Sequence, residues 1–184
     1  MKSNSKIELR KKFLKLRKLI KNKKKKDEQI FQNLIHFPQF IVSKSLLVYA
    51  SLADEVDTKE IIKYCWKNNK LVYIPFVKLN KIGKIRNFSD LEQYLHSKYL
   101  QPKIYTEKFH LDLIIIPGVV FDRNGNRIGT GNGWYDRFLK DYPNVLKVGI
   151  AYDEQISDET LPNEKYDIQL NFIITPTFLG ATLL

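Results

Sequence analysis

The chain contains the stretch Ile114-Ile-Ile-Pro-Gly-Val-Val-Phe-Asp-Arg-Asn-Gly-Asn-Arg-Ile-Gly-Thr-Gly-Asn-Gly-Trp-Tyr-Asp-Arg-Phe-Leu139, an apolar strand pattern followed by a glycine-dense loop and a helix pattern. Four of the eight glycines fall between Gly125 and Gly133. Bare glycines permit positive φ angles and remove the side chains that would keep an anion away from the backbone N–H groups. A helix beginning near Trp134 adds its N-terminal dipole at the same point. This stretch therefore predicts a phosphate-binding loop, with Arg127 reaching in beside it.

The glycine spacing matches neither of the common nucleotide-binding motifs. It lacks the G-x-x-x-x-G-K-[ST] of a P-loop, and it reads G-x-G-x-G where a dinucleotide fingerprint reads G-x-G-x-x-G. Glycines alone also suit a mobile strand-to-helix connection without a ligand. The residues that follow favour a site, because Trp134, Tyr135, Asp136 and Arg137 place two aromatic rings, a carboxylate and a guanidinium next to the loop.

Strand and helix patterns alternate along the chain. Strand patterns cover residues 46–50, 71–75, 113–117, 145–151 and 172–175, and helix patterns cover 61–66 and 134–141. Ser89 to Glu92 matches a capping box, and residues 78–108 have the irregular pattern of a flap or hairpin. This order predicts an α/β fold with a parallel or mixed sheet covered by helices. The turns after Ala50, Pro75, Pro117 and Ala151 would share the carboxyl edge of that sheet, which brings Glu55 towards the glycine loop.

The composition suits one compact domain. The 184 residues are 43% hydrophobic, and they include a single cysteine, Cys65, which excludes an internal disulfide and predicts core packing. His36, His96 and His110 share no metal-binding spacing. No apolar run is long enough to span a membrane and no signal sequence is evident, so we expect a cytoplasmic protein.

The net charge of +11 is carried by the N-terminal segment. Residues 1–26 hold 13 basic residues and one acid, for a charge of +12, while the other 158 residues hold 18 basic and 19 acidic residues, for −1. The first interpretation is a helix with an apolar stripe of Leu9, Phe13, Leu16 and Ile20, a solvated lysine face and a turn or frayed end at residues 23–26. The second is an arm for nucleic acid, which is disfavoured because no aromatic residues interleave the lysines. The third is a local phosphate contact from Lys6 and Arg10, which share one helix face.

Five ordered motifs give the chain a family resemblance. The segment from Pro117 to Leu139 closely resembles the signature of the 5-formyltetrahydrofolate cyclo-ligases, also called methenyltetrahydrofolate synthetases. Residues 6–10 resemble the K-x-x-L-R element of that family, and residues 49–58 resemble its D-E-[IV]-x-T segment. Residues 149–155 and 161–167 follow its C-terminal pattern. The resemblance implies one cyclo-ligase domain over residues 1–184, with a three-layer α/β fold similar to sugar-phosphate isomerases and coenzyme A transferases.

The resemblance also implies an activity and a set of residues for it. The expected reaction converts 5-formyltetrahydrofolate to 5,10-methenyltetrahydrofolate with ATP and magnesium, by phosphorylation of the formyl oxygen and attack of N10. The ATP site would comprise Lys6, Arg10, Arg127, Ile128, Gly129, Thr130, Gly131, Asn132, Gly133, Trp134 and Tyr135. The folate site would comprise Arg10, Ala50, Glu55, Thr130, Gly131, Asn132, Gly133 and Trp134. Catalytic roles would fall to Arg127, Tyr135 and Glu55, and the metal would be held by Asp136 and Asn171. ATP and the folate are the expected partners of a monomeric protein, with no membrane and no nucleic acid.

Several of these residues have a plainer interpretation, and three depart from the family pattern. Asp136 could cap its helix or pair with Arg137 or Lys140, Glu55 could be a solvated loop acid, and Trp134 could be a packing anchor. Asp122 is expected to form a turn with Gly125. Most relatives have Tyr at the place of Trp134, many have an acid at the place of Asn171, and Asn132 replaces Lys or Gly. A neutral Asn would bind magnesium less strongly than a carboxylate does.

Overall fold

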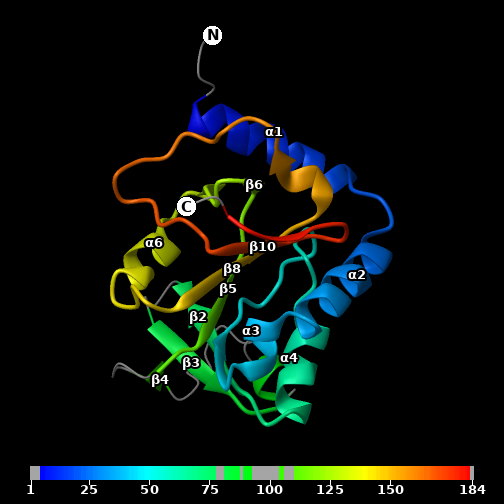
Figure 1. Cartoon of the computed structure of the whole chain (residues 1–184), viewed down its shortest axis with the longest axis vertical. Coiled ribbons are helices and arrows are strands. Elements are labelled where there is room, and N and C mark those ends of the chain that lie inside the picture. The colour runs from blue at the N-terminus through cyan, green and yellow to red at the C-terminus, as the bar shows by residue number, and fades with distance from the viewer. Residues whose placement is uncertain (1–4, 78–80, 88, 93–103, 106–109, 183–184) are drawn as a thin grey trace.

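A computed structural model describes residues 5–77, 81–87, 89–92, 104–105 and 110–182 (Figure 1). Eight strands form the main sheet in the order β11-β10-β8-β5-β1-β2-β3-β4. They are β1 Ser45–Leu47, β2 Leu71–Phe76, β3 Lys81–Ile85, β4 Ile104–Tyr105, β5 Leu113–Ile116, β8 Leu146–Ile150, β10 Phe172–Ile174 and β11 Leu179–Ala181. The central pairings β2–β1–β5–β8–β10 are parallel, and the pairings towards both edges are antiparallel. The predicted α/β fold with a mostly parallel sheet is confirmed.

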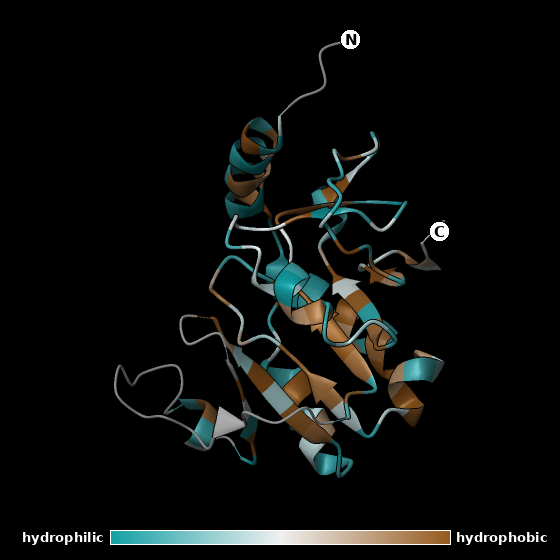
Figure 2. Cartoon of the chain, turned by 90° about the vertical axis from the view of Figure 1, so that its left-hand side faces the viewer, coloured by the Kyte–Doolittle hydropathy of each residue, from teal (hydrophilic) through white to brown (hydrophobic). Residues whose placement is uncertain are grey.

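Helices bury both faces of the sheet, which is why its central strands are apolar throughout. The helices are α1 Lys6–Leu19, α2 Lys23–Ile35, α3 Pro38–Val42, α4 Lys59–Lys67 and α6 Trp134–Leu139. Helices α2, α3 and α4 pack on the face that presents Leu46, Ile115 and Val148, whereas α6 packs on the face that presents Leu47 and Ile114. Figure 2 shows the strands of the sheet as the most hydrophobic part of the chain. Each such side chain contributes about 2 kcal/mol when it is fully buried.

The predicted strands and helices agree with the structure to within a few residues, apart from the capping box at Ser89. The helix predicted over residues 134–141 ends at Leu139, because the backbone N–H groups of Asp141 and Tyr142 bond three residues back in a tight turn before Pro143. The capping box predicted at Ser89 is displaced, since Ser89 is itself helical and the side chain of Asn87 caps the N–H of Asp90 at 2.9 Å. The expected hairpin in residues 78–108 is present as β2–β3 and β3–β4, although much of that range lies outside the described residues.

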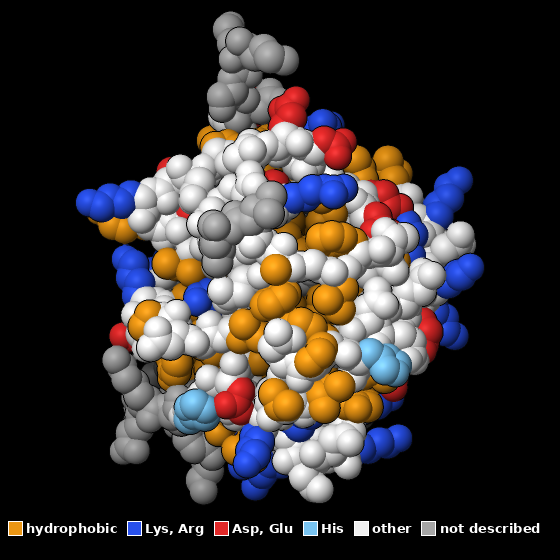
Figure 3. Space-filling view, in the orientation of Figure 1, with side chains coloured by type: hydrophobic (Ala, Val, Ile, Leu, Met, Phe, Trp, Pro, Cys, Tyr) orange, Lys and Arg blue, Asp and Glu red, His pale blue; other side chains and the backbone are white. Residues whose placement is uncertain are grey.

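The N-terminal segment forms two helices, and the prediction of a frayed end at residues 23–26 was wrong. Asn22 adopts a left-handed conformation, with φ of 55°, and separates α1 from α2, which begins at Lys23. Tertiary contacts hold this first turn, because Lys23 Nζ donates to the carbonyl of Ala53 at 2.9 Å and Lys26 pairs with Glu154. Figure 3 shows Lys and Arg side chains spread around the edge of one face rather than gathered into one patch. The structure therefore supports the prediction of a helix with exposed lysines, although Arg17 takes the place of Leu16 on its buried face.

A second, three-stranded sheet packs against α1 and leads into the glycine loop. It consists of β6 Val120–Asp122, β7 Arg127–Ile128 and β9 Ile156–Ser157. Asp122 is buried and accepts hydrogen bonds from the backbone N–H groups of Asn124, Asn126 and Leu161, which confirms its predicted role in the turn. Leu9 and Phe13 of α1 pack against Val119 and Val120 in the same cluster. The apolar run of the sequence is thus two strands, β5 and β6, broken at Pro117 and Gly118.

Cys65 lies in α4 and is fully buried, as predicted for a packing residue. Burial raises the pKa of its thiol to about 12, so the reactive thiolate is suppressed. In the described part of the chain, no helix has the length and apolar character needed to cross a membrane.

The carboxylate of Asp112 ties β5 to β1, and this contact generates a prediction for stability. Its Oδ2 accepts the backbone N–H groups of Lys44 and Ser45 at 2.7 and 2.9 Å. Burial would raise the pKa of Asp112, but these hydrogen bonds outweigh it and lower the pKa from 3.8 to about 2. Because the folded pKa is the lower one, the stabilisation is complete above about pH 4 and is lost as the pH falls towards 2.

We expect Asp112→Asn to lower the free energy of unfolding by about 1 kcal/mol at pH 7, a value reduced for solvent screening. Urea unfolding of both proteins between pH 7 and pH 3 measures the difference, which should shrink below pH 4. Asp158→Asn, at an exposed carboxylate, is the matched control. A difference that stays constant over this range would contradict the assignment.

Candidate active site

A pocket of about 520 Å³ opens at the carboxyl edge of the parallel strands. It is lined by six segments of the chain, which contribute Lys6, Arg10, Tyr49, Ala50, Leu52, Glu55, Pro75, Val77, Pro117, Gly118, Arg127, Ile128, Gly129, Thr130, Gly131, Asn132, Gly133, Trp134, Tyr135, Asp136, Glu164 and Asp167. The predicted convergence of the turns after Ala50, Pro75 and Pro117 is therefore correct, and Glu55 faces the same cavity as the glycine loop. Ala151, whose turn was expected at this edge too, lies outside the lining.

The glycine loop leaves β7 and runs exposed along one wall of the pocket. Gly131 and Gly133 have φ angles of 107° and 63°, a region that residues with a Cβ rarely adopt. Gly129 has an ordinary φ, and a Cβ built on it would meet no atom within 4 Å. The loop thus needs glycine for backbone conformation at two positions and has open space in front of the third.

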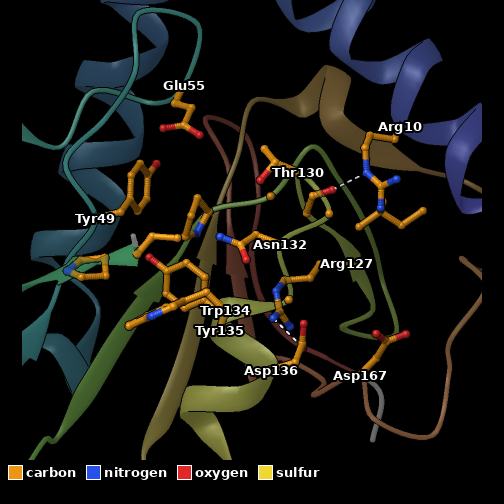
Figure 4. Close-up of a pocket in the computed structure, with 18 of the residues that line it drawn as sticks. Arg10, Tyr49, Glu55, Arg127, Thr130, Asn132, Trp134, Tyr135, Asp136 and Asp167 are labelled. Carbon is orange, nitrogen blue, oxygen red and sulfur yellow. Dashed lines mark hydrogen bonds and ion pairs between the residues drawn. The ribbon is translucent and has the colours of Figure 1, made fainter. Parts of the chain in front are cut away.

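Two cations of α1 line the pocket, and Figure 4 shows one of them, Arg10, against the glycine loop. Arg10 Nε donates to the carbonyl of Gly129 at 2.7 Å. Lys6 Nζ lies 2.5 Å from Asp167 and 3.1 Å from Glu164. Burial would lower the pKa of Lys6, but the hydrogen bonds and charges of these two acids raise it, so the ammonium stays charged. The predicted placement of Lys6 and Arg10 at the pocket is correct, and their common helix face is what brings both there.

Arg127 and Asp136 form an ion pair on the floor of the site. Arg127 Nη2 donates to Asp136 Oδ1 at 2.7 Å, and Nη1 donates to the carbonyl of Ile168 at 2.5 Å. The same Oδ1 accepts the backbone N–H of Ile168 at 3.1 Å. Asp136 therefore pairs with Arg127 rather than with Arg137 or Lys140, while Arg137 donates to the carbonyl of Asn132 at 2.7 Å and braces the loop.

The structure does not bring Asn171 to this pocket. Its side-chain oxygen accepts the backbone N–H of Lys147 at 2.9 Å, and the residue lies outside the pocket lining. Asp167 is a carboxylate that does line the pocket. Its neighbour Ile168 donates a backbone hydrogen bond to Asp136, which keeps this part of the chain close to Asp136. No cluster of three or more His, Cys, Asp or Glu residues with metal-binding geometry occurs among the described residues. A metal here would rely on one or two carboxylates together with atoms of a ligand.

Glu55 stands on the wall opposite the cations and is not a solvated loop acid. Its side chain is 11% exposed, and its Oε2 accepts the backbone N–H of Leu52 at 3.0 Å. Burial raises the pKa of Glu55, and the Leu52 N–H together with the charge of Arg17 opposes that rise. Tyr49 lies on the same wall, with its hydroxyl donating to the carbonyl of Val56 at 3.2 Å.

Trp134 and Tyr135 close the site with aromatic surface. Trp134 is 3% exposed and stacks on Phe138 with ring centroids 4.8 Å apart, so the packing interpretation of this residue is correct. Its indole Nε1 is buried and has no hydrogen-bond partner among the residues that the structure describes. The Tyr135 ring meets Trp134 edge to face at 4.9 Å.

Eight lining residues were not among those predicted: Tyr49, Leu52, Pro75, Val77, Pro117, Gly118, Glu164 and Asp167. Most of them end or follow a parallel strand, so the topology of the sheet identifies them once the strand order is known. Glu164 and Asp167 come from a late loop that no strand pattern connects to the pocket. The family resemblance of residues 161–167 was a signal for this loop, and the ion pairs to Lys6 show how it joins the site.

Comparison with known proteins agrees with this geometry. The chain is 30% identical to the 5-formyltetrahydrofolate cyclo-ligase of Escherichia coli K12 over 160 residues, which cover 82% of this chain and 87% of the relative. It is 34% identical to a probable 5-formyltetrahydrofolate cyclo-ligase of Caenorhabditis elegans, with 85% and 83% covered. The solved structure of Aquifex aeolicus 5,10-methenyltetrahydrofolate synthetase superposes with a TM-score of 0.75 at 28% identity, covering 96% of this chain and 92% of that one.

The match extends to the family as a whole. The sequence model of the 5-formyltetrahydrofolate cyclo-ligase family aligns with residues 2–176, which include every segment that lines the pocket. The chain belongs to the 5-formyltetrahydrofolate cyclo-ligase family.

Proposed function

We propose that this protein converts 5-formyltetrahydrofolate to 5,10-methenyltetrahydrofolate with ATP and magnesium, and releases ADP and phosphate. One observation carries the proposal: a single pocket holds a bare glycine loop and three cations on one side and the buried carboxylate of Glu55 on the other. Such a pocket can hold a polyanion against an organic substrate. Membership of the cyclo-ligase family supplies the identity of the two ligands.

The glycine loop is proposed to hold the triphosphate. The proposal uses the backbone N–H groups of residues 129–133, which line the pocket together with Lys6, Arg10 and Arg127. Lys6 and Arg127 are paired with carboxylates, and Arg10 lies against the loop itself. Phosphoryl transfer requires mainly positioning and cationic stabilisation of the equatorial oxygens. In this assignment Arg10 also fixes the loop, through its bond to the carbonyl of Gly129.

The residues present fit a magnesium ion that arrives with the nucleotide. Magnesium commonly takes one or two protein carboxylates and completes its shell with phosphate oxygens and water. Asp136 has both oxygens at the pocket floor, with Oδ1 already accepting two hydrogen bonds, and Asp167 lines the pocket beside it. We therefore propose Asp136 as a ligand and Asp167 in the place expected for Asn171. The ion would neutralise charge on the transferring phosphoryl group.

The chemistry follows from the weakness of a formamide as an electrophile. The formyl oxygen attacks the γ-phosphorus, an O–P bond forms, and the bond to ADP breaks. The N10 lone pair then attacks the formyl carbon, N10 loses its proton, and the oxygen leaves as phosphate. Arg127 is placed to stabilise the phosphoryl oxygens, and Glu55 to hold the folate near its reacting end. Tyr135 completes the proposed catalytic set at the boundary of the two sites.

A direct assay tests this function. Protein, magnesium, ATP and 5-formyltetrahydrofolate are mixed, and the rise in methenyltetrahydrofolate absorbance is recorded together with ADP. We expect equal amounts of both products, and no product without ATP. If neither product forms, the assignment is wrong; if ATP is hydrolysed without use of this folate, another substrate is indicated.

Asp136→Asn should lower kcat/KM at least about 100-fold, because the amide keeps the shape of the carboxylate but loses its charge at the metal. A titration of magnesium in the same assay should show the half-maximal concentration moved upwards. Asp141→Asn, at an exposed acid just beyond α6, provides the control. An unchanged magnesium dependence in Asp136→Asn would remove this residue from the metal site.

Two alanine variants distinguish a glycine that is needed for its backbone angle from a glycine that leaves space for the phosphate. Gly131→Ala should lower the free energy of unfolding by about 1 kcal/mol and also raise the KM for ATP, because its φ of 107° disfavours a Cβ. Gly129→Ala should leave stability unchanged and raise the KM for ATP roughly 10-fold, because its Cβ enters the space assigned to phosphate. Thermal unfolding and ATP titrations measure both effects. Normal ATP kinetics in Gly129→Ala would place the phosphates elsewhere.

A further inference from the structure

Arg17 is a buried charge that the proposed reaction does not yet use. It lies in the last turn of α1 and is 3% exposed, and no Lys or Arg in the described part of the chain is more buried. It lies on the same buried helix face as Leu9 and Phe13. The sequence pattern predicted that Leu16 would be the next buried residue on this face. A guanidinium at such a position needs partners that compensate its lost hydration.

The partners of Arg17 are parts of the pocket wall. Its Nε and Nη2 donate to Asp54 Oδ2 at 3.0 and 2.7 Å. Its Nη1 lies 3.6 Å from Glu55 Oε1 and donates to the carbonyl of Gly118 at 3.5 Å. Glu55 and Gly118 both line the pocket, whereas Arg17 and Asp54 stand behind them. One side chain therefore joins α1 to the segments that follow β1 and β5.

Both oxygens of Glu55 are consequently held. Oε1 faces Arg17 and Oε2 accepts the N–H of Leu52, while the backbone carbonyl accepts the hydroxyl of Tyr152 at 3.1 Å. Lys23, at the start of α2, adds a second positive charge, and Asp54 and Tyr49 are the other titratable groups around the carboxylate. The burial of Glu55 favours its neutral form, and Arg17 is the nearest charge that opposes this.

We propose that Arg17 is a positioning residue for the folate: it keeps the Glu55 carboxylate charged and oriented towards the N–H groups of the substrate, and it fixes the Gly118 carbonyl beside it. Arg17 itself touches no reactant. The proposal rests on the function assigned above. It predicts different effects on the two ligands, because the hydrogen bonds and ion pairs of Arg17 go to Asp54, Glu55 and Gly118 rather than to the glycine loop.

Kinetics of Arg17→Met, Arg17→Lys and Glu55→Gln test the proposal. Arg17→Met should raise the KM for 5-formyltetrahydrofolate about 10-fold and leave the KM for ATP within about twofold. The folate defect should be larger at pH 6 than at pH 8, because Glu55 without Arg17 takes up a proton more readily. Arg17→Lys should recover part of the loss. Lys18→Met, at an exposed neighbour on α1, is the matched control.

A double variant distinguishes positioning from general support of the fold. If Arg17 acts through Glu55, Arg17→Met added to Glu55→Gln should change the folate KM less than about twofold. Equal increases in both KM values, or additive effects in the double variant, would overturn the proposal. Should Arg17→Met fail to fold, Arg17→Lys replaces it in the same cycle.

A carbon-13 NMR titration of the Glu55 carboxyl group gives a readout that is independent of turnover. Its signal is identified by its loss in Glu55→Gln. We expect the pKa of Glu55 to rise further in Arg17→Met, because a positive charge that opposes its rise is lost, and an unchanged pKa would refute the role of Arg17. If the wild-type protein turns over no folate, the assigned function fails, while this titration still decides whether Arg17 controls Glu55.

Discussion

The glycine loop, which we propose to bind phosphate through its backbone, is held by atoms outside itself, and the rest of this site depends on that constraint. Residues 129–133 offer few side chains that could pack, so hydrogen bonds from residues around the loop fix its course. Arg10 donates to Gly129, and Arg137 donates to Asn132. Arg127, at the start of the segment, is anchored by Ile168 and Asp136. Of the cations proposed to meet the triphosphate, Arg10 therefore also shapes the loop, and Arg127 is fixed where the loop begins.

Helix α1 serves both the fold and the site, and the two roles follow from one helical periodicity. Leu9, Phe13 and Arg17 point to the interior four residues apart, and the first two cover the small β6–β7–β9 sheet. Lys6 and Arg10 lie beside that stripe and line the pocket. The capping box of Ser5 and Glu8 fixes the start of the helix at Lys6, and Lys6 is also the first residue of the chain that lines the pocket. The other lysines of α1, which are Lys11, Lys12, Lys15 and Lys18, are exposed.

The local sequence patterns predicted a large part of this arrangement, because apolar runs indicate burial and glycines indicate unusual backbone angles. Continuous apolar runs located the parallel strands, and their order placed Glu55 and the glycine loop at one edge of the sheet. Asp122 and Gly125 formed the expected turn, and Cys65 entered the core. The errors occurred where tertiary contacts decide the outcome. The run from Lys23 to Lys26 is helical because Ala53 and Glu154 bind two of its lysines, and Asn171 binds a strand backbone instead of facing the pocket.

By itself, then, the sequence determined the class of fold, the positions of the strands, the glycine loop and the residues that flank it, since each of these depends on neighbours within a few positions along the chain. The tertiary structure alone decided which distant charges meet: Arg127 with Asp136, Lys6 with Asp167, and Arg17 with Asp54 and Glu55. Such pairs join residues up to 161 positions apart. Their formation depends on strand order and burial in the folded protein, which no local spacing encodes.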